Sequence, residues 1–270
     1  MSDLHLEVGQ QYASFHITPR APYLILAGNI GQLADYDAYR DFLSSQCENF
    51  EAVYLVLGNH EFFGVTRQEG LRRADMLQEE PQMKGKLVIM NRKRIDFDYV
   101  TLLGCTLHSR IPPESEELVG QKIDDFRCIL NWTVADHNAE HTKDTKWLMD
   151  EIKLIKGKGP FTNQRIMVIS HHAPLTKWTC KPSEENSPLI SASATDLLTG
   201  EERLCFCLGV QRWIFGHTQY TTELDFGTRL TSNQRGSVAQ GVKASLTSRV
   251  VGLGDRFRKH TFNVDKVIHV

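Results

Sequence analysis

The feature that most constrains this chain is a set of short apolar segments, each of which ends at a glycine or serine and is followed at once by polar side chains. These segments are residues 23–28, 52–58, 165–170 and 212–216. Each is rich in β-forming residues and too short for a helix, so we expect buried strands. Apolar residues recur at helical spacing in the intervening stretches 35–47, 67–80 and about 137–156. An order of strand, helix and strand favours parallel pairing, which predicts an α/β fold.

The polar residues at the strand ends are the candidate functional groups. They are Asn29, the run Asn59-His60-Glu61, the pair His171-His172, and the run His217-Thr218-Gln219, with Asp3 and His5 as a fifth cluster at the N-terminus. In parallel α/β sheets, sites form outside the carboxyl ends of the strands. A single histidine there is usually an ordinary loop residue, and asparagine tolerates left-handed turns. Five clusters of imidazole, carboxylate and amide groups together predict a divalent-metal site.

Composition excludes several classes of protein. The chain has 270 residues, of which 41% are hydrophobic and 24% charged, with a formal net charge of -2. No apolar run approaches the roughly 20 residues of a membrane-spanning helix, and the first residues do not resemble a signal peptide. The near-zero charge argues against nucleic acid as a partner. We therefore expect a cytoplasmic protein that binds neither membranes nor nucleic acid.

The cysteines agree with a reducing compartment. Six are spread along the chain, and their spacings fit neither a zinc motif nor a disulfide framework. We expect reduced thiols, with a regulatory bond between Cys205 and Cys207 as the alternative for the one close pair.

The ordered clusters resemble the motifs of the calcineurin-like metallophosphoesterase superfamily, which run D-x-H, G-D, G-N-H-[DE], a histidine of H-x-x-P type, and G-H-x-H. The matching residues are Asp3 and His5, Gly28-Asn29, Gly58 to Glu61, His171 to Pro174, and Gly216 to Gln219. The resemblance covers residues 3–219. It implies an αββα sandwich of two mixed β-sheets flanked by helices, and one phosphoesterase domain over residues 1–270.

The same resemblance implies two metal positions and a residue that assists the leaving group. The first position would take Asp3, His5, Asn29 and Gln219. The second would take Asn29 as a bridge together with Asn59, His171 and His217. An ungapped alignment favours His171 over His172. His60 would act as an acid for the leaving group or stabilise charge on the phosphoryl oxygens. The implied cofactor is a divalent ion: Mn, Fe, Zn or Mg.

Three departures from the superfamily pattern fall on the first metal position. Asn29 stands where a bridging aspartate is expected, Gln219 replaces a histidine, and only two residues precede Asp3 where a strand is expected. At about 4 Å, two unit charges interact by several kcal/mol at an effective dielectric constant of about 20, so the lost carboxylate weakens the site. We expect one firmly held metal, at the second position, assisted by a small phosphorylated or anionic metabolite.

Further residues have both structural and functional interpretations. Arg235 follows an expected hairpin over 221–232 and would reach a bound phosphate, or else lie on a surface loop. His108 is interpreted as a packed or solvated histidine, with a substrate contact as the alternative. Asp136 is expected to cap the long helix. The acidic run 114–117 is expected to form a solvated loop, and residues 174–203 a long loop that sets specificity.

Three functions follow, and the sequence leaves all of them open. The first is a metal-dependent phosphoesterase that hydrolyses a small phosphomonoester or phosphodiester with metal-activated water, weakened by Asn29 and Gln219. The second is a degenerate protein of this fold that binds a ligand without hydrolysing it. The third is an enzyme that uses its histidine-rich pocket for non-hydrolytic acid–base chemistry on a metabolite.

Overall fold

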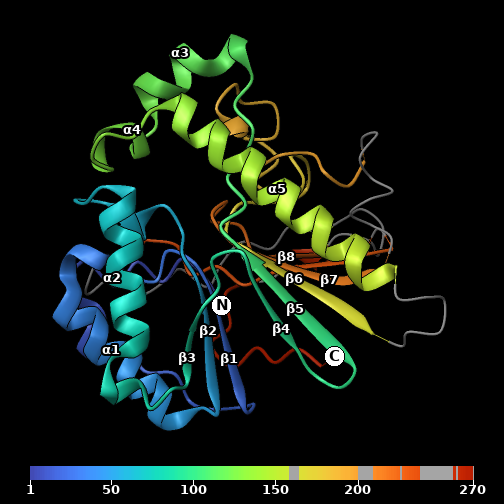
Figure 1. The fold of residues 1–270 in the computed structure, drawn as a ribbon. Coiled ribbons are helices and arrows are strands. Elements are labelled where there is room, and N and C mark those ends of the chain that lie inside the picture. The colour runs from blue at the N-terminus through green and yellow to red at the C-terminus, as the bar shows by residue number, and fades with distance from the viewer. Residues whose placement is uncertain (158–163, 200–208, 226, 238–257, 260, 270) are drawn as a thin grey trace.

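A three-stranded parallel sheet forms one half of the computed structural model, which describes residues 1–157, 164–199, 209–225, 227–237, 258–259 and 261–269. Its strands, in spatial order, are β1 (Tyr23–Ala27), β2 (Ala52–Val56) and β3 (Leu87–Ile89). Helices α1 (Tyr36–Asn49) and α2 (Arg67–Glu79) connect these strands and lie beside the sheet (Figure 1). Strands β1 and β2 and both helices are close to the ranges expected from the hydrophobic pattern.

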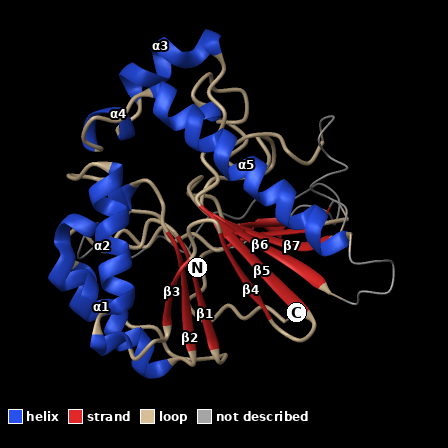
Figure 2. Ribbon diagram, in the orientation of Figure 1, coloured by secondary structure: helices blue, strands red, loops and turns tan. Residues whose placement is uncertain are grey.

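The second sheet is mixed and has seven described strands, in the order β10-β8-β9-β7-β6-β5-β4. The strands are β4 (Lys93–Asp96), β5 (Val100–Cys105), β6 (Arg165–Ser170), β7 (Val210–Phe215), β8 (Thr222–Asp225), β9 (Arg229–Ser232) and β10 (Arg258–Lys259). Strands β5, β6, β7 and β9 run parallel, whereas β8 and β9 form the expected antiparallel hairpin. Helix α5 (Val134–Lys156) lies on the outer face of this sheet (Figure 2).

Three buried clusters show how the layers pack. The cluster between the first sheet and its helices includes Leu26, Leu55, Tyr39 and Leu43. The cluster between the second sheet and α5 includes Val168, Trp213, Leu148 and Ile152. The cluster between the two sheets includes Val56, Leu102, Met167, Ile169 and Ile214. Successive residues of β6 alternate between the last two clusters because side chains in a strand point to opposite faces. This packing confirms the expected αββα arrangement.

Two elements depart from the sequence-based expectation. The acidic run expected to be a solvated loop lies in helix α3 (Pro113–Lys122), and α4 (Asp125–Cys128) follows it. Proline at the start and glutamates in the first turn both favour a helix, because they suit its unpaired N–H groups and its dipole. Asp136 is not the cap of α5. Thr133 caps the helix, and Asp136 completes the capping box three residues later.

The shorter helical turns are of 3-10 type and connect the larger elements. They are Gln11–Ala13, Leu33–Asp35, His60–Phe62, Pro81–Met83 and Ile190–Ala192. No described helix is long and apolar enough to cross a membrane. Cys47, Cys105, Cys128 and Cys180 are free thiols, whereas Cys205 and Cys207 lie outside the described residues.

Residues 1 and 2 occupy the place of the strand expected before Asp3. The ammonium group of Met1 donates to the Ile25 carbonyl at 2.8 Å, and the Met1 carbonyl accepts from Ala27 N–H at 2.9 Å. Ser2 forms a parallel bridge with Gln234 after β9. These main-chain bonds of Met1 and Ser2 therefore fix Asp3 from both sides without a full strand.

An apolar cavity of about 470 Å³ lies next to Met1, and none of the predicted site residues lines it.

Candidate metal centre

Three predicted ligands of the second metal position meet at the carboxyl ends of β2, β6 and β7. His171 Nε2 lies 3.1 Å from Asn59 Oδ1 and 3.1 Å from His217 Nδ1. The rings of the two histidines are 4.8 Å apart in an edge-to-face arrangement. The structure thus brings together three side chains that are separated by more than 40 residues in the sequence.

The hydrogen-bond partners of these groups leave acceptor atoms facing one another. His171 Nδ1 lies 2.9 Å from the Ala27 carbonyl, so this nitrogen carries the proton and Nε2 presents a lone pair. Asn59 donates its amide N–H to Asp125 at 2.6 Å, which turns Oδ1 toward His171. A proton on His217 Nδ1 would form a hydrogen bond to His171 Nε2. Asn59 Oδ1 would still lie opposite the same Nε2 lone pair with no proton between them. This set of oxygen and nitrogen donors fits a divalent cation.

Burial keeps these imidazoles in the neutral form that a metal ligand requires. Burial, followed by the proximity of other histidines, lowers the pKa of His171 well below its usual value. The same causes lower the pKa of His217 to about 3. Neutral imidazole binds a metal without first losing a proton, so both side chains are ready ligands near neutral pH.

The first metal position is built around Asp3 and His5, which are both almost fully buried. The Asp3 carboxylate accepts the backbone N–H of His217 at 3.0 Å, which connects the two predicted positions. His5 Nε2 is buried, has no hydrogen-bond partner in the described structure, and lies 3.9 Å from Asp3 Oδ1. These two groups could contribute to a cation site.

Asn29 changes what the first position offers. Its Oδ1 accepts the backbone N–H of His60 at 3.0 Å, and this bond turns its Nδ2 toward Asp3 Oδ1 at 3.3 Å. An N–H donor therefore points to the carboxylate where the superfamily pattern has a bridging oxygen. An amide nitrogen is no metal ligand, so the arrangement fits a second cation poorly.

Gln219, the remaining predicted ligand of the first position, is not part of the buried group. Its side chain is exposed, and no hydrogen bond to Asp3, His5 or Asn29 is found among the described residues. It borders a polar cavity of about 230 Å³ that also reaches His217. The cavity is also lined by Cys180, Lys181, Glu184, Ile190 and Ser193. The long loop after β6 therefore provides one wall of the space beside the candidate metal centre.

Unusual backbone geometry marks this part of the molecule. Asp3, His5, Asn29, His217 and Gln219 all have positive φ angles, between 47° and 68°. Such angles are uncommon for residues other than glycine and cost free energy that the surrounding structure must supply. Five of the predicted site residues share this conformation, which is typical of functional sites.

Glu61 holds the two glycine turns together. Its buried carboxylate accepts backbone N–H groups from Gly58 at 2.7 Å, Asn29 at 2.9 Å and Ile30 at 2.8 Å. Tyr39 donates its hydroxyl to the same carboxylate at 3.2 Å. Glu61 therefore fixes Asn29 and Asn59 relative to one another and does not itself face the candidate metal centre.

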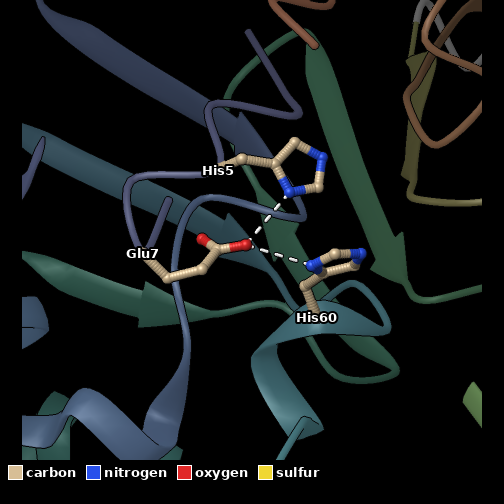
Figure 3. A group of neighbouring side chains, drawn as sticks. All are labelled: His5, Glu7 and His60. Atoms are coloured by element: carbon tan, nitrogen blue, oxygen red, sulfur yellow. Dashed lines mark hydrogen bonds and ion pairs between the residues drawn. The ribbon is translucent and has the colours of Figure 1, made fainter. Parts of the chain in front are cut away.

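His60 lies at the edge of the site and is partly exposed. Its Nδ1 is 3.0 Å from Glu7 Oε1, and the same oxygen lies 3.1 Å from His5 Nδ1 (Figure 3). Burial would raise the pKa of Glu7, but the hydrogen bonds from His5 and His60 outweigh it and lower the pKa to about 2. The three side chains have donor atoms close enough to hold an ion or to share protons.

Arg235 is engaged with the N-terminal loop. Its guanidinium group donates to the Leu4 carbonyl at 3.0 Å and to Gln11 Oε1 at 2.7 Å, and it stacks over the Phe15 ring at 4.7 Å. These contacts hold the loop that carries Asp3 and His5. A direct contact between Arg235 and phosphate stays a prediction that these interactions do not support.

A second group of histidines lies behind the candidate metal centre. The His172 ring stacks on His217 at 4.3 Å and approaches His108 and His137 at 5.7 and 5.6 Å. His108 is buried and bonds Asp144 at 2.9 Å, in agreement with its interpretation as a packed residue. His171 Nε2 lies 3.1 Å from Asn59 Oδ1, whereas His172 Nδ1 bonds the Ser109 hydroxyl, so the geometry favours His171 as the ligand.

Two residues of the site were missed in the sequence. Glu7 follows Asp3 and His5 at the same two-residue interval, and this regular spacing is the sequence signal that could have identified it. Asp125 gave none, because it belongs to a short helix that the hydrophobic pattern does not predict. Both are carboxylates that contact a predicted site residue.

An αββα sandwich with imidazole, amide and carboxylate groups at the carboxyl ends of its strands defines a metallophosphoesterase fold. The chain belongs to the calcineurin-like phosphoesterase family, whose model matches residues 1–220. It is 23% identical over 235 residues to uncharacterized protein L509 of Acanthamoeba polyphaga mimivirus, covering 79% of this chain and 78% of the viral protein. Its fold is similar to that of phosphopantetheinyl hydrolase (PptH) from Mycobacterium tuberculosis, with a TM-score of 0.63, 16% identity, and coverage of 87% and 88% of the two chains.

Proposed function

We propose that this protein hydrolyses a small phosphomonoester or phosphodiester with one firmly bound divalent cation. The observation that carries the proposal is the convergence of Asn59 Oδ1 and the His171 Nε2 lone pair, 3.1 Å apart, with His217 beside them. A cation between these groups would turn a repulsive arrangement into a favourable one. Membership of the family supports a metal-dependent phosphoesterase in general.

Each side chain has a separate task in this proposal. Asn59, His171 and His217 would hold the ion, which when bound lowers the pKa of a coordinated water and stabilises charge on phosphoryl oxygens. Asp3 adds negative charge at the same edge. His60 would face the leaving group and supply its proton. None of these tasks requires a bridging carboxylate at position 29.

The space beside the centre supports a small substrate. The polar cavity of about 230 Å³ reaches from His217 to Lys181, whose ammonium group pairs with Glu184 at 3.4 Å and would be shared with an anionic ester. PptH is named as a phosphopantetheinyl hydrolase, so a phosphopantetheine ester belongs in the substrate panel. Turnover rates across this panel distinguish a phosphomonoesterase from a phosphodiesterase.

The direct test is an assay of purified protein with nitrophenyl phosphate, bis-nitrophenyl phosphate and a phosphopantetheine ester, each with Mn²⁺, Zn²⁺, Fe²⁺ or Mg²⁺. We expect turnover that EDTA abolishes and that His171→Gln lowers at least 100-fold. His16→Gln, at an exposed histidine, is the matched control and should retain full activity.

One observation favours a second function. Because the Asn29 amide donates to Asp3, this carboxylate has a hydrogen-bond partner without a metal, as in a binding protein that has lost hydrolysis. No turnover with any ion, together with activity in an Asn29→Asp/Gln219→His variant, would favour this alternative. Turnover that EDTA leaves unchanged and His60→Ala abolishes would instead favour acid–base chemistry on a metabolite.

A further inference from the structure

One carboxylate oxygen contacts two of the site histidines through the same ring atom. Glu7 Oε1 lies 3.1 Å from His5 Nδ1 and 3.0 Å from His60 Nδ1. The two rings are 4.4 Å apart and nearly perpendicular, and Figure 3 shows both Nδ1 atoms turned toward the carboxylate. Glu7 is 9% exposed, so little water competes for this oxygen.

The chemistry of a carboxylate fixes where the protons lie. An ionised carboxylate only accepts hydrogen bonds, so both Nδ1 atoms must donate. The proton on one ring nitrogen determines the role of the other, because neutral imidazole has one donor and one acceptor. Glu7 therefore fixes the role of Nδ1 in both rings, and only Nε2 is left to bond other groups.

The environment of each Nε2 differs, and so does its use. His5 Nε2 is buried without a partner in the described structure and lies 3.9 Å from Asp3 Oδ1. His60 stacks on Phe63 at 4.2 Å and is partly exposed. With Nδ1 held by Glu7, Nε2 is the ring atom of His60 that is left to contact a substrate.

We propose that Glu7 is a positioning residue that holds His5 and His60 in the Nδ1–H form, so that His60 presents Nε2 to the leaving group. The part that concerns the leaving group rests on the proposed function. In that step a proton passes from His60 Nε2 to the leaving oxygen, and the ring returns to its neutral Nδ1–H form. Carboxylates that orient a ligand histidine affect metal affinity or activity about 10- to 100-fold when they are replaced.

The first arm of the test reads the protons directly and needs no activity. Long-range ¹H–¹⁵N correlation spectra of metal-free protein with labelled histidine distinguish the two tautomers. His5→Gln and His60→Gln variants assign the signals. We expect Nδ1–H for both rings in the unaltered protein. Signals from Nε2–H alone in either ring would overturn the proposal.

The second arm replaces the acceptor. In Glu7→Leu, a side chain of similar length offers no acceptor, so neither Nδ1–H keeps its partner and either ring is free to move its proton to Nε2. We expect at least one ring to switch tautomer and kcat to fall 10- to 100-fold with KM changed less than threefold. Glu48→Leu, at an exposed glutamate that bonds Lys84, is the matched control and should change neither reading. Glu7→Leu spectra identical to those of the unaltered protein would overturn the proposal.

A third arm separates positioning from metal binding. Added Zn²⁺, for which the proposed ligands are Asn59, His171 and His217, should leave both Nδ1–H signals in place. Loss of both Nδ1–H signals would mean that His5, Glu7 and His60 ligate the ion themselves, which would overturn the positioning role. Since the spectra are independent of turnover, the predicted tautomers in a protein without hydrolysis would reject the proposed function and leave the role of Glu7 standing.

Discussion

Asn59 Oδ1 and His171 Nε2 face each other across 3.1 Å as two acceptor atoms, because the Asn59 amide N–H is taken by Asp125 and the His171 Nδ1 proton by a backbone carbonyl. Buried polar groups without a complementary partner cost free energy. A protein that keeps such an arrangement gains most from binding a cation there. This relationship leads to the first prediction.

Replacing Asp125 should weaken metal binding without removing a ligand. In Asp125→Asn the new amide can donate where a carboxylate accepted, so Asn59 is free to turn its Oδ1 away from His171. We expect metal affinity to fall about 10- to 100-fold, measured by titration calorimetry. Asp124→Asn, at the exposed neighbouring position that bonds Arg127, should bind as the unaltered protein does. Equal affinity in both variants would show that Asp125 does not orient the ligand.

Restoring the expected ligands should create a second metal site. In the Asn29→Asp/Gln219→His variant, a carboxylate replaces the amide that now points to Asp3, and an imidazole replaces an exposed amide. We expect the number of bound divalent ions to rise from one to two per chain, measured by elemental analysis after gel filtration. Hydrolysis should increase with it. Unchanged stoichiometry would mean that Asn29 is not what excludes the second ion.

Removing the charge of Glu61 should destabilise the fold. Its carboxylate accepts three backbone N–H groups, and the NH₂ of a glutamine would oppose at least one of them. Hydrogen bonds to charged groups contribute about 1.5–3 kcal/mol each, so we expect Glu61→Gln to lower the free energy of unfolding by about 2–4 kcal/mol. Urea denaturation measures this, with Glu48→Gln as the exposed control. A decrease of less than about 0.5 kcal/mol in the free energy of unfolding would contradict the role of Glu61 in holding the two glycine turns together.

Stability should fall as the pH drops below about 6.5. Five histidines have lowered pKa values because they are buried: His137, His141, His171, His172 and His217. Below pH 6.5 they take up protons in the unfolded chain but not in the folded one, so the unfolded state gains. Burial raises the pKa of Asp3, Glu61 and Asp125, and at His5 the opposing effect of burial is outweighed by the Glu7 carboxylate, which raises the pKa. These four groups act in the opposite direction, but the five histidines outnumber them.

The size of this effect can be measured. Each such imidazole contributes a slope of about 1.4 kcal/mol per pH unit, and several act together. We expect the free energy of unfolding of metal-free protein to fall by more than 1 kcal/mol between pH 6.5 and 5.5. Because the pKa of Glu7 is lowered from 4.5 to about 2, the free energy of unfolding falls further as the pH drops through this range. Stability that is constant or rising between pH 6.5 and 5.5 would refute this account.

The strands and their polar ends could be predicted because they depend on local pattern. The apolar runs ending at Gly28, Gly58, Ser170 and Gly216 form strand ends whose polar residues gather at one edge. The same reasoning placed the long helix α5. It missed α3 because the glutamates of that helix suggest a solvated loop, whereas its stability depends on proline and charge at its first turn.

The hydrogen-bond network could not be predicted, because it depends on contacts between distant parts of the chain. Asp125 reaches Asn59 from a helix more than 60 residues away. Arg235 returns to the N-terminal loop, as its position after the hairpin suggested, but it bonds Leu4 and Gln11. The orientation of the Asn29 amide depends on the His60 backbone N–H, which no spacing reveals.

The most direct test of the central claim is elemental analysis of protein that has been loaded with a divalent ion and passed through a desalting column. The account predicts one tightly held ion per chain, lost in His171→Gln and retained in Asp3→Asn. Two ions per chain, or one that remains in His171→Gln and disappears in Asp3→Asn, would contradict it.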